Sequence, residues 1–310
     1  MSRPLPILAV QAAPVPWNVS ATWDKFEAEL RALRAAYPLT RLFVYPELFL
    51  MAIGGMSHAA DKGWERRDLA EPIPGPRTDR LAELARDIGA WLIPGSVYER
   101  GDDGHIYNTA LAFAPDGSLR ARYRKVFPWR PWESPSAGSD FVVFEIDGVG
   151  RAGLMICYDG WFPEVARQLA WLGAEVIFQV TATPTSDRDQ EVVLARANAI
   201  ANQVFVVNVN MGGRPGPGRS VIADPEGHPL QLAGDGEEYL SEVLDLDIVS
   251  RVRRFGTVAM NRMWAQLDDE GSSIWLPMYG GHIQPRPALP DVAREGGQLT
   301  EEVMRVPTKY

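Results

Sequence analysis

The sequence contains one cysteine, few histidines and no long apolar run. Its 310 residues include a single cysteine and four histidines. One cysteine excludes an internal disulfide framework and a metal site built from several thiolates. Gln, Glu or Pro interrupts every apolar stretch before it reaches the ~18 residues that a membrane-spanning helix needs. We therefore expect no membrane span and a cytoplasmic protein.

The histidines and acids do not predict a metal site. His58, His105, His228 and His282 show no HxxxH or similar spacing, so a metal-dependent hydrolase has little support. The acidic cluster 268–270 (DDE) has no partner at metal-ligand spacing and is interpreted as a solvated turn. We expect no metal.

The charge pattern argues against a nucleic-acid partner. The net charge is -9, and the basic residues are scattered along the chain. RVRRF (251–255) is short, and GGRPGPG (212–218) lacks the Gly-Lys-Ser/Thr that follows a phosphate-binding loop. We interpret that glycine-rich segment as a hairpin or an active-site loop. The expected partner is a small-molecule substrate.

Short apolar runs alternate with stretches of helical periodicity, which predicts a layered α/β fold. The start of the chain superficially resembles a signal peptide, but its apolar run is short, and we expect a buried first strand there. We expect a helix at 76–89 to have Thr78 as its cap, with Pro76 before it. The predicted strands are 6–10, 41–47, 90–99, 107–114, 119–125, 141–146, 151–156, 175–180, 204–210, 219–224 and 239–246, and the other predicted helices are 21–36, 162–173 and 187–203.

The chain length is near the upper limit for one hydrophobic core. Residues 1–250 carry the regular alternation and are expected to form the main domain. Residues 251–310 are rich in Pro, Gly and charge, with weaker periodicity. We expect this extension to belong to the same fold and to wrap the surface or a neighbouring subunit.

Three reactive residues each follow a predicted strand. Glu47 lies in VYPELF, Lys125 in RYRKVFPW and Cys157 in GLMICYDGWFPE. Strand ends at one edge of a sheet are where open α/β folds place ligands, so a catalytic cluster is geometrically possible. A helix start after Cys157 and a nearby ammonium would favour its thiolate. A lone cysteine is also often a small buried apolar residue, and the residues alone leave both interpretations open.

The ordered segments PELF, YRKVFPW and CYDGWFPE resemble the three signature segments of the nitrilase superfamily, from the first strand to about residue 250. Members of that superfamily use a glutamate, a lysine and a cysteine at these positions. Glu133, eight residues after Lys125, matches a further glutamate that many members place beside the lysine and the thiol. The resemblance implies a four-layer αββα sandwich, no cofactor, and a homodimer or a higher homo-oligomer that pairs through helices near the cysteine.

The resemblance also implies a carbon-nitrogen hydrolase with a thioester intermediate. Cys157 attacks the substrate carbonyl, Glu47 acts as general base, and Lys125 stabilises the oxyanion together with the backbone N–H of Tyr158. The lysine segment is most similar to aliphatic amidases and formamidases, whereas DGWFPEVAR is close to N-carbamoyl amide hydrolases. True nitrilases usually carry Trp and Glu after the cysteine, where this chain has Tyr158 and Asp159.

These segments leave several alternatives open. A carboxamide substrate is favoured, followed by an N-carbamoyl amide, and then by a nitrile or by acyl transfer through the same thioester. A non-catalytic binding protein would require the three residues to be vestigial. Candidate substrate contacts are Trp129, Tyr158 and Trp161, which adjoin the predicted site, and Thr183, which follows the strand at 175–180. Aromatic side chains in such places more often pack than bind.

Overall fold

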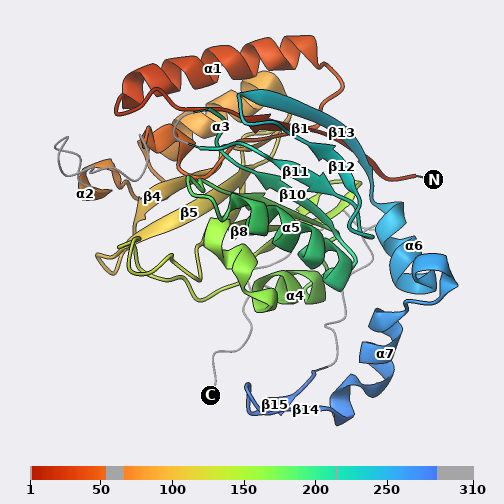
Figure 1. The fold of residues 1–310 in the computed structure, drawn as a ribbon. Coiled ribbons are helices and arrows are strands. Elements are labelled where there is room, and N and C mark those ends of the chain that lie inside the picture. The colour runs from red at the N-terminus through yellow and green to blue at the C-terminus, as the bar shows by residue number, and fades with distance from the viewer. Residues whose placement is uncertain (1, 54–65, 214–215, 285–310) are drawn as a thin grey trace.

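The computed structural model describes residues 2–53, 66–213 and 216–284, in which two β-sheets stack face to face between helices (Figure 1). In the first sheet the strand order is β13-β1-β2-β3-β5-β4, with β6 pairing β5. In the second it is β12-β11-β10-β9-β8-β7. The first sheet consists of β1 (Pro4–Gln11), β2 (Leu42–Val44), β3 (Trp91–Ile93), β4 (Ser96–Arg100), β5 (Ile106–Phe113), β6 (Leu119–Arg124) and β13 (Glu238–Asp245). The second consists of β7 (Val143–Ile146), β8 (Gly150–Ile156), β9 (Val176–Val180), β10 (Phe205–Val209), β11 (Val221–Ala223) and β12 (Pro229–Leu232).

Helices cover the outer face of each sheet. Figure 1 shows α1 (Val19–Ala36) and α3 (Pro76–Ile88) on one side of the stacked sheets, and α4 (Pro163–Trp171) and α5 (Arg188–Asn202) on the other. The layer order is therefore αββα, as the resemblance to the nitrilase superfamily implies. The short helices are α2 (Arg66–Leu69), η1 (Phe49–Met51) and η3 (Cys157–Trp161).

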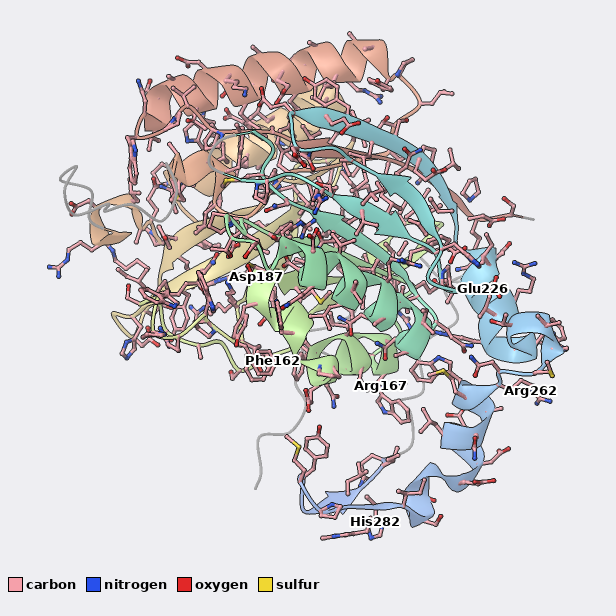
Figure 2. All side chains as sticks on the ribbon, in the orientation of Figure 1. Phe162, Arg167, Asp187, Glu226, Arg262 and His282 are labelled. Carbon is pink, nitrogen blue, oxygen red and sulfur yellow. The ribbon has the colours of Figure 1, made fainter. Side chains whose placement is uncertain are left out.

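Alternating side chains build one apolar layer between the sheets and one beneath the helices, because successive residues of a strand point to opposite faces. In β1, Ile7 and Ala9 face the inter-sheet core, whereas Leu8 and Val10 pack in the cluster that includes α1 and α3. In the second sheet Met155 joins the cluster that includes α4 and α5. Figure 2 shows how densely side chains occupy the space between the layers.

The C-terminal segment leaves the sandwich as α6 (Asp247–Phe255), η4 (Thr257–Ala259), α7 (Met263–Glu270), η5 (Gly271–Ser273) and a hairpin of β14 (Trp275–Leu276) and β15 (Gly281–His282). Trp264 anchors α7, because its ring lies 5.7 Å from that of Trp171 on α4. The hairpin with His282 lies away from both main sheets (Figures 1 and 2). Within the described ranges no helix has both the length and the apolar character that crossing a bilayer requires.

Several local predictions are wrong, each for a physical reason. Pro94 and Gly95 divide the strand predicted at 90–99 into β3 and β4. Thr78 is the third residue of α3 rather than its cap: its hydroxyl donates to Gly75 O and accepts from Gly75 N, both at 2.8 Å. The acidic cluster 268–270 ends α7 and is not a turn. Strand β12 has no predicted counterpart, since its side chains are mostly exposed. Residues 214–215 of the glycine-rich segment, His58 and residues 285–310 lie outside the described residues.

Candidate active site

Glu47 lies three residues after β2, where the first sheet meets the second. Its backbone N–H donates to Thr181 O, 3.3 Å away beyond the end of β9. The side chain is buried at 3% exposure. Its Oε1 accepts hydrogen bonds from Lys125 Nζ at 3.0 Å and from Asn108 Nδ2 at 2.7 Å. A carboxylate is thus held in the interior by one cation and one amide.

Lys125 directly follows β6 and is held between two carboxylates. Its backbone N–H donates to Asn108 O on β5 at 2.8 Å, which continues the pairing of the two strands. Its Nζ lies 3.0 Å from Glu47 Oε1 and 2.7 Å from Glu133 Oε2. Only 1% of the lysine side chain is exposed, so both acids are needed to compensate a buried ammonium.

Glu133 reaches the lysine from a tight turn. The backbone N–H of Trp129 donates to Glu133 Oε2 at 2.6 Å, and the backbone N–H of Glu133 donates to Trp129 O at 2.8 Å. Asn108 Nδ2 makes a longer contact of 3.4 Å with Glu133 Oε1. The turn therefore delivers its carboxylate to a fixed position beside Lys125.

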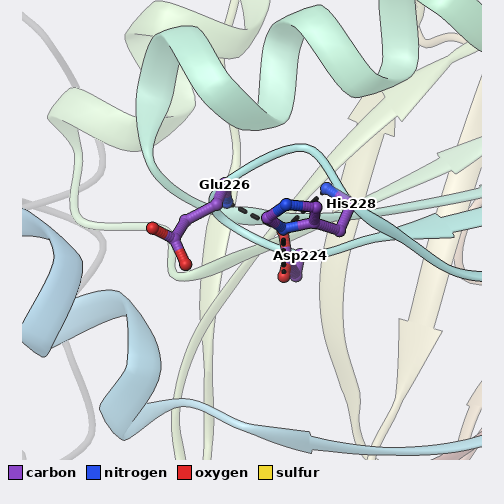
Figure 3. Close-up of side chains that lie close together, drawn as sticks. All are labelled: Asp224, Glu226 and His228. Carbon is purple, nitrogen blue, oxygen red and sulfur yellow. Dashed lines mark hydrogen bonds and ion pairs between the residues drawn. The ribbon is translucent and has the colours of Figure 1, made fainter. Parts of the chain in front are cut away.

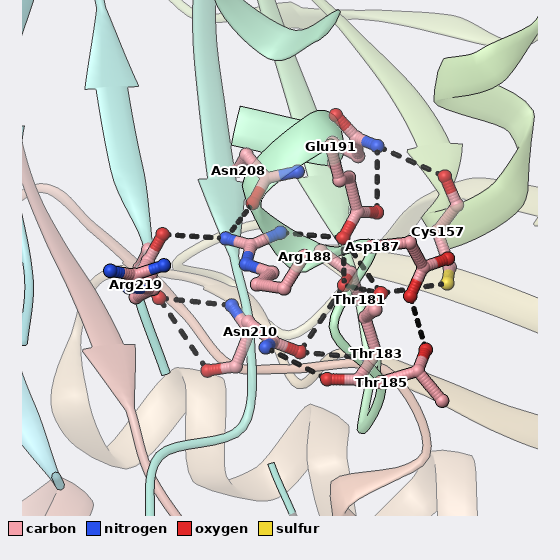
Figure 4. A network of polar contacts seen from close by, with 12 residues as sticks. Cys157, Thr181, Thr183, Thr185, Asp187, Arg188, Glu191, Asn208, Asn210 and Arg219 are labelled. Carbon is pink, nitrogen blue, oxygen red and sulfur yellow. Dashed lines mark hydrogen bonds and ion pairs between the residues drawn. The ribbon is translucent and has the colours of Figure 1, made fainter. Parts of the chain in front are cut away.

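Cys157 lies at the junction of β8 and η3, in the second sheet. Its φ of 47° falls in the left-handed region, which costs a non-glycine residue about 1–3 kcal/mol and persists only where surrounding contacts impose it. One such contact is the hydrogen bond from Gln179 Nε2 to Cys157 O, at 3.0 Å. The sulfur contacts Thr183 Oγ1 at 3.5 Å (Figure 4). The cysteine therefore sits on a sharp, strained strand-to-helix turn.

The charged groups shift one another's pKa values in different directions. Burial raises the pKa of Glu47, and the Lys125 ammonium offsets only part of that rise. Burial would also raise the pKa of Glu133, but Lys125 and the hydrogen bonds to this carboxylate hold it below its usual value. Burial lowers the pKa of Lys125, but the negative charges around it raise that pKa well above its usual value. Lys125 thus lies between a glutamate whose pKa is raised and one whose pKa is lowered, which suits the first to accept a proton and the second to stay ionised.

The expectation of a stabilised thiolate at Cys157 is wrong for the resting protein. Removal of the sulfur from water raises the pKa of the thiol well above its usual value, and the charge of Glu47 adds to the rise. Lys125 opposes the shift without overcoming it. Only the short 3-10 helix η3 begins at Cys157, and the longer helix α4 begins at Pro163. The site holds a neutral thiol whose proton must leave when it reacts.

Of the four residues predicted to contact substrate, two have polar contacts within the site. Thr183 contacts the sulfur, and the main chain of Trp129 holds Glu133. Tyr158 and Trp161 lie on η3, with ring centroids 6.1 Å apart, and Tyr158 packs edge-on against Phe162 at 5.3 Å. Their observed contacts are therefore aromatic packing beside the cysteine.

Sequence reasoning missed Asn108 and Asp159. Asn108 is a buried amide on β5 between the two carboxylates, and its one signal is a polar residue inside an apolar run. Asp159 accepts from the backbone N–H groups of Phe127 and Ile156 and from the hydroxyl of Tyr123, at 2.7–2.9 Å. It therefore ties the lysine segment to the cysteine turn. Burial raises the pKa of Asp159 to about 6.

Asp224, Glu226 and His228 form the one group among the described residues whose side chains approach as metal ligands do (Figure 3). The Asp224 carboxylate accepts from the backbone N–H groups of Glu226 and His228, each at 2.9 Å, and lies 3.2 Å from His228 Nδ1. These contacts close the turn between β11 and β12. We therefore interpret the three residues as part of a turn and not as a metal site.

Comparison with known proteins identifies the family of this chain. The family model described as carbon-nitrogen hydrolase matches residues 7–254. The chain belongs to the carbon-nitrogen hydrolase family. It is 32% identical to a formamidase of Bacillus thuringiensis (strain Al Hakam) over 189 residues, which are 60% of this chain and 55% of the formamidase. The match thus spans little more than half of that relative.

Solved structures of this family share the fold. Nit3 of Saccharomyces cerevisiae, a member of branch 10 of the nitrilase superfamily, superposes with a TM-score of 0.72 at 26% identity, covering 81% of this chain and 94% of Nit3. A variant of the amidase from Nesterenkonia sp. AN1 superposes with a TM-score of 0.67 at 25% identity, covering 82% and 94%. In that structure the acetamide moiety of fluoroacetamide is covalently added at the active-site cysteine. Both the superfamily and the αββα fold expected from the sequence are confirmed.

Proposed function

We propose that this carbon-nitrogen hydrolase cleaves a small carboxamide to a carboxylic acid and ammonia, with Cys157 as nucleophile. The observation that carries the proposal is the position of Lys125 Nζ, 3.0 Å from Glu47 and 2.7 Å from Glu133, with the thiol within the electrostatic influence of all three. Such an arrangement offers a base, a fixed cation and a sulfur nucleophile in one buried cluster.

In the first step Cys157 Sγ forms a bond to the amide carbonyl carbon as its proton passes to Glu47. The raised pKa of Glu47 makes it a stronger base than an ordinary carboxylate, which suits this transfer near neutral pH. The raised pKa of the thiol keeps the sulfur neutral until a carbonyl is present. The carbonyl oxygen then carries the negative charge of a tetrahedral intermediate.

Lys125 stabilises that oxyanion. Its raised pKa keeps it protonated across the working pH range, and its two carboxylate partners fix its ammonium before substrate binds. Preorganised donors of this kind are worth about 10²–10³ in rate each. We assign a second donor to the backbone N–H of Tyr158, which follows the nucleophile. Glu133 anchors Lys125 and does not transfer protons, consistent with its lowered pKa.

The second half-reaction regenerates the enzyme. The carbon–nitrogen bond breaks as Glu47 returns its proton to the leaving nitrogen, which departs as ammonia and leaves a thioester on Cys157. Glu47 then accepts a proton from water, whose oxygen attacks the thioester carbonyl. The acid is released and the thiol is restored. Two relatives support an amidase with a nucleophilic cysteine: one is named formamidase, and the other carries the acetamide moiety of fluoroacetamide covalently added at its active-site cysteine.

Ammonia release from a panel of amides tests the proposal. We expect turnover of formamide or a short aliphatic amide, with loss of at least ~10³-fold in Cys157→Ala because covalent catalysis is removed. The matched control is Thr22→Val, which removes a fully buried hydroxyl on α1 that bonds to Val15 O and Asn18 O. Equimolar carbon dioxide and ammonia from N-carbamoyl compounds alone would move the assignment to carbamoyl hydrolysis. Full activity of Cys157→Ala would refute the proposal that Cys157 is the nucleophile.

A further inference from the structure

A second buried charge cluster lies beside the nucleophile and has no part in the mechanism above. Glu191 on α5 is 1% exposed and forms an ion pair with Arg188, which is equally buried, through Oε2 at 2.6 Å. Arg188 is fixed in turn by Asn208 Oδ1 at 2.5 Å and Arg219 O at 2.7 Å (Figure 4). A charge pair this deeply buried requires such partners, so its geometry is rigid.

Thr183 links this ion pair to the sulfur. Its Oγ1 lies 2.7 Å from Glu191 Oε2, 3.1 Å from Thr181 Oγ1 and 3.5 Å from Cys157 Sγ. Figure 4 shows the chain of contacts from the arginine to the thiol. Thr183 is 7% exposed, so water does not compete strongly for its hydroxyl.

The hydroxyl has one hydrogen, and the distances decide where it points. A carboxylate paired with Arg188 can only accept, and its contact with Thr183 is the shortest of the three. Once the Thr183 hydrogen is committed to Glu191, its oxygen can only accept from the other two neighbours. The contact with Cys157 is then S–H donating to oxygen, which exists for the thiol and not for the thiolate.

We propose that Thr183, oriented by Glu191 and Arg188, is a positioning residue that accepts the hydrogen of the Cys157 thiol and keeps the sulfur protonated until substrate arrives. Its importance for turnover rests on the proposed function, whereas its contact with the sulfur does not. The charged groups around this sulfur are Glu47 after β2, Lys125 after β6, Glu133 in the 129–133 turn and Glu191 on α5. On the cysteine's own turn, Asp159 is engaged by Tyr123 and two backbone N–H groups.

The pH dependence of iodoacetamide labelling tests the proposal, because the single cysteine of this chain makes the label unambiguous. In Thr183→Val the apparent pKa of the thiol should fall by roughly half a unit to one unit, the range expected for one net hydrogen bond. Thr183→Ser keeps a hydroxyl and should match the parent. Thr22→Val is the matched control, because it removes a fully buried threonine hydroxyl on α1 that bonds to Val15 O and Asn18 O, and it should leave the thiol pKa unchanged.

The S–H stretching band in the infrared reads the same hydrogen bond directly. It should move to higher frequency in Thr183→Val and stay in place in Thr183→Ser. An unchanged or raised thiol pKa in Thr183→Val would overturn the proposal, because the hydroxyl would then be idle or donating to sulfur. If circular dichroism shows that the valine variant is unfolded, Thr183→Ala provides the same comparison. Failure of the parent to hydrolyse any amide would instead overturn the proposed function, while the labelling profile would still decide the role of Thr183.

Discussion

Removing the amide of Asn108 should shift the pH dependence of catalysis through Glu47. Asn108 Nδ2 donates to Glu47 Oε1 at 2.7 Å and thereby lowers the pKa of that carboxyl against the larger effect of burial. A hydrogen bond to a charged group contributes about 1.5–3 kcal/mol. Because one pKa unit corresponds to ~1.36 kcal/mol, Asn108→Leu should raise the pKa of Glu47 by roughly one to two units.

The assay is kcat/KM for amide hydrolysis as a function of pH, whose acidic limb reports the essential base of the free enzyme. Loss of the hydrogen-bond donor destabilises the charged form of Glu47, which raises the pKa of this carboxyl. The acidic limb therefore moves to higher pH. On that limb the rate falls about 10- to 100-fold at fixed pH, in proportion to the shift of one to two units. At pH values above the new limb the loss is smaller.

The control for this experiment is Asn202→Leu, which removes another buried amide. Asn202 Nδ2 donates to Asn198 O within α5 and has no contact with the two glutamates. This variant should lose stability without moving the acidic limb. If Asn108→Leu also leaves the acidic limb in place while it folds, Glu47 is not the base whose ionisation limits the reaction.

Other changes test the remaining parts of the site and the fold. Lys125→Met should lower kcat by about 10²–10³ because an oxyanion donor is lost. Lys125→Arg keeps the charge in a group of different shape, so it should also lose activity but should be more stable to urea than Lys125→Met. The pKa of Asp159 is raised from 3.8 to about 6, so this group opposes folding above pH 6 and stops doing so as pH falls below 4. As pH rises from 4 to 6.5, the unfolding free energy of Asp159→Asn should therefore increase by up to about 3 kcal/mol relative to that of the parent. If this difference between variant and parent does not change with pH, the pKa of Asp159 is not raised. Trp264→Ala should lower the free energy of unfolding, measured by urea denaturation, by about 3–5 kcal/mol because a fully buried ring is lost, and kcat should stay unchanged. Trp275→Ala, at an exposed ring, is its control.

Local periodicity predicts a layered α/β fold and places Glu47, Lys125 and Cys157 at strand ends, whereas the four-layer αββα order and the roles of these residues are implied by the resemblance to the nitrilase superfamily. Glu47, Lys125 and Cys157 each come after a run of strand residues, and strand ends are readable from the pattern. The split between β3 and β4 depends on close approach of Gly95 to Pro46, where an added Cβ would lie 1.8 Å from the Pro46 carbonyl oxygen. Pro94 and Gly95 are themselves a local turn signal that breaks the strand, whereas the approach to Pro46 joins segments far apart in the chain and has no local signal.

The supporting polar residues were harder to predict because their roles come from tertiary contacts. Asn108 and Glu191 lie inside a strand and a helix, where type and spacing do not reveal which face meets the site. The thiol illustrates a different difficulty. Its ionisation depends on how far the surrounding carboxylates and burial outweigh one lysine, and that balance can be weighed only when the side chains are in place.

The two residues proposed as oxyanion donor and nucleophile come from different sheets: Lys125 extends β6 of the first, and Cys157 extends β8 of the second. Their separation is therefore set by the thickness of the apolar layer between the sheets, to which β5 and β8 contribute small residues such as Ala110 and Ala152. A larger side chain in place of either alanine would widen the gap between the two sheets at that point. The distance between Lys125 and Cys157 therefore depends on the volume of apolar side chains in the inter-sheet layer as well as on the two residues themselves.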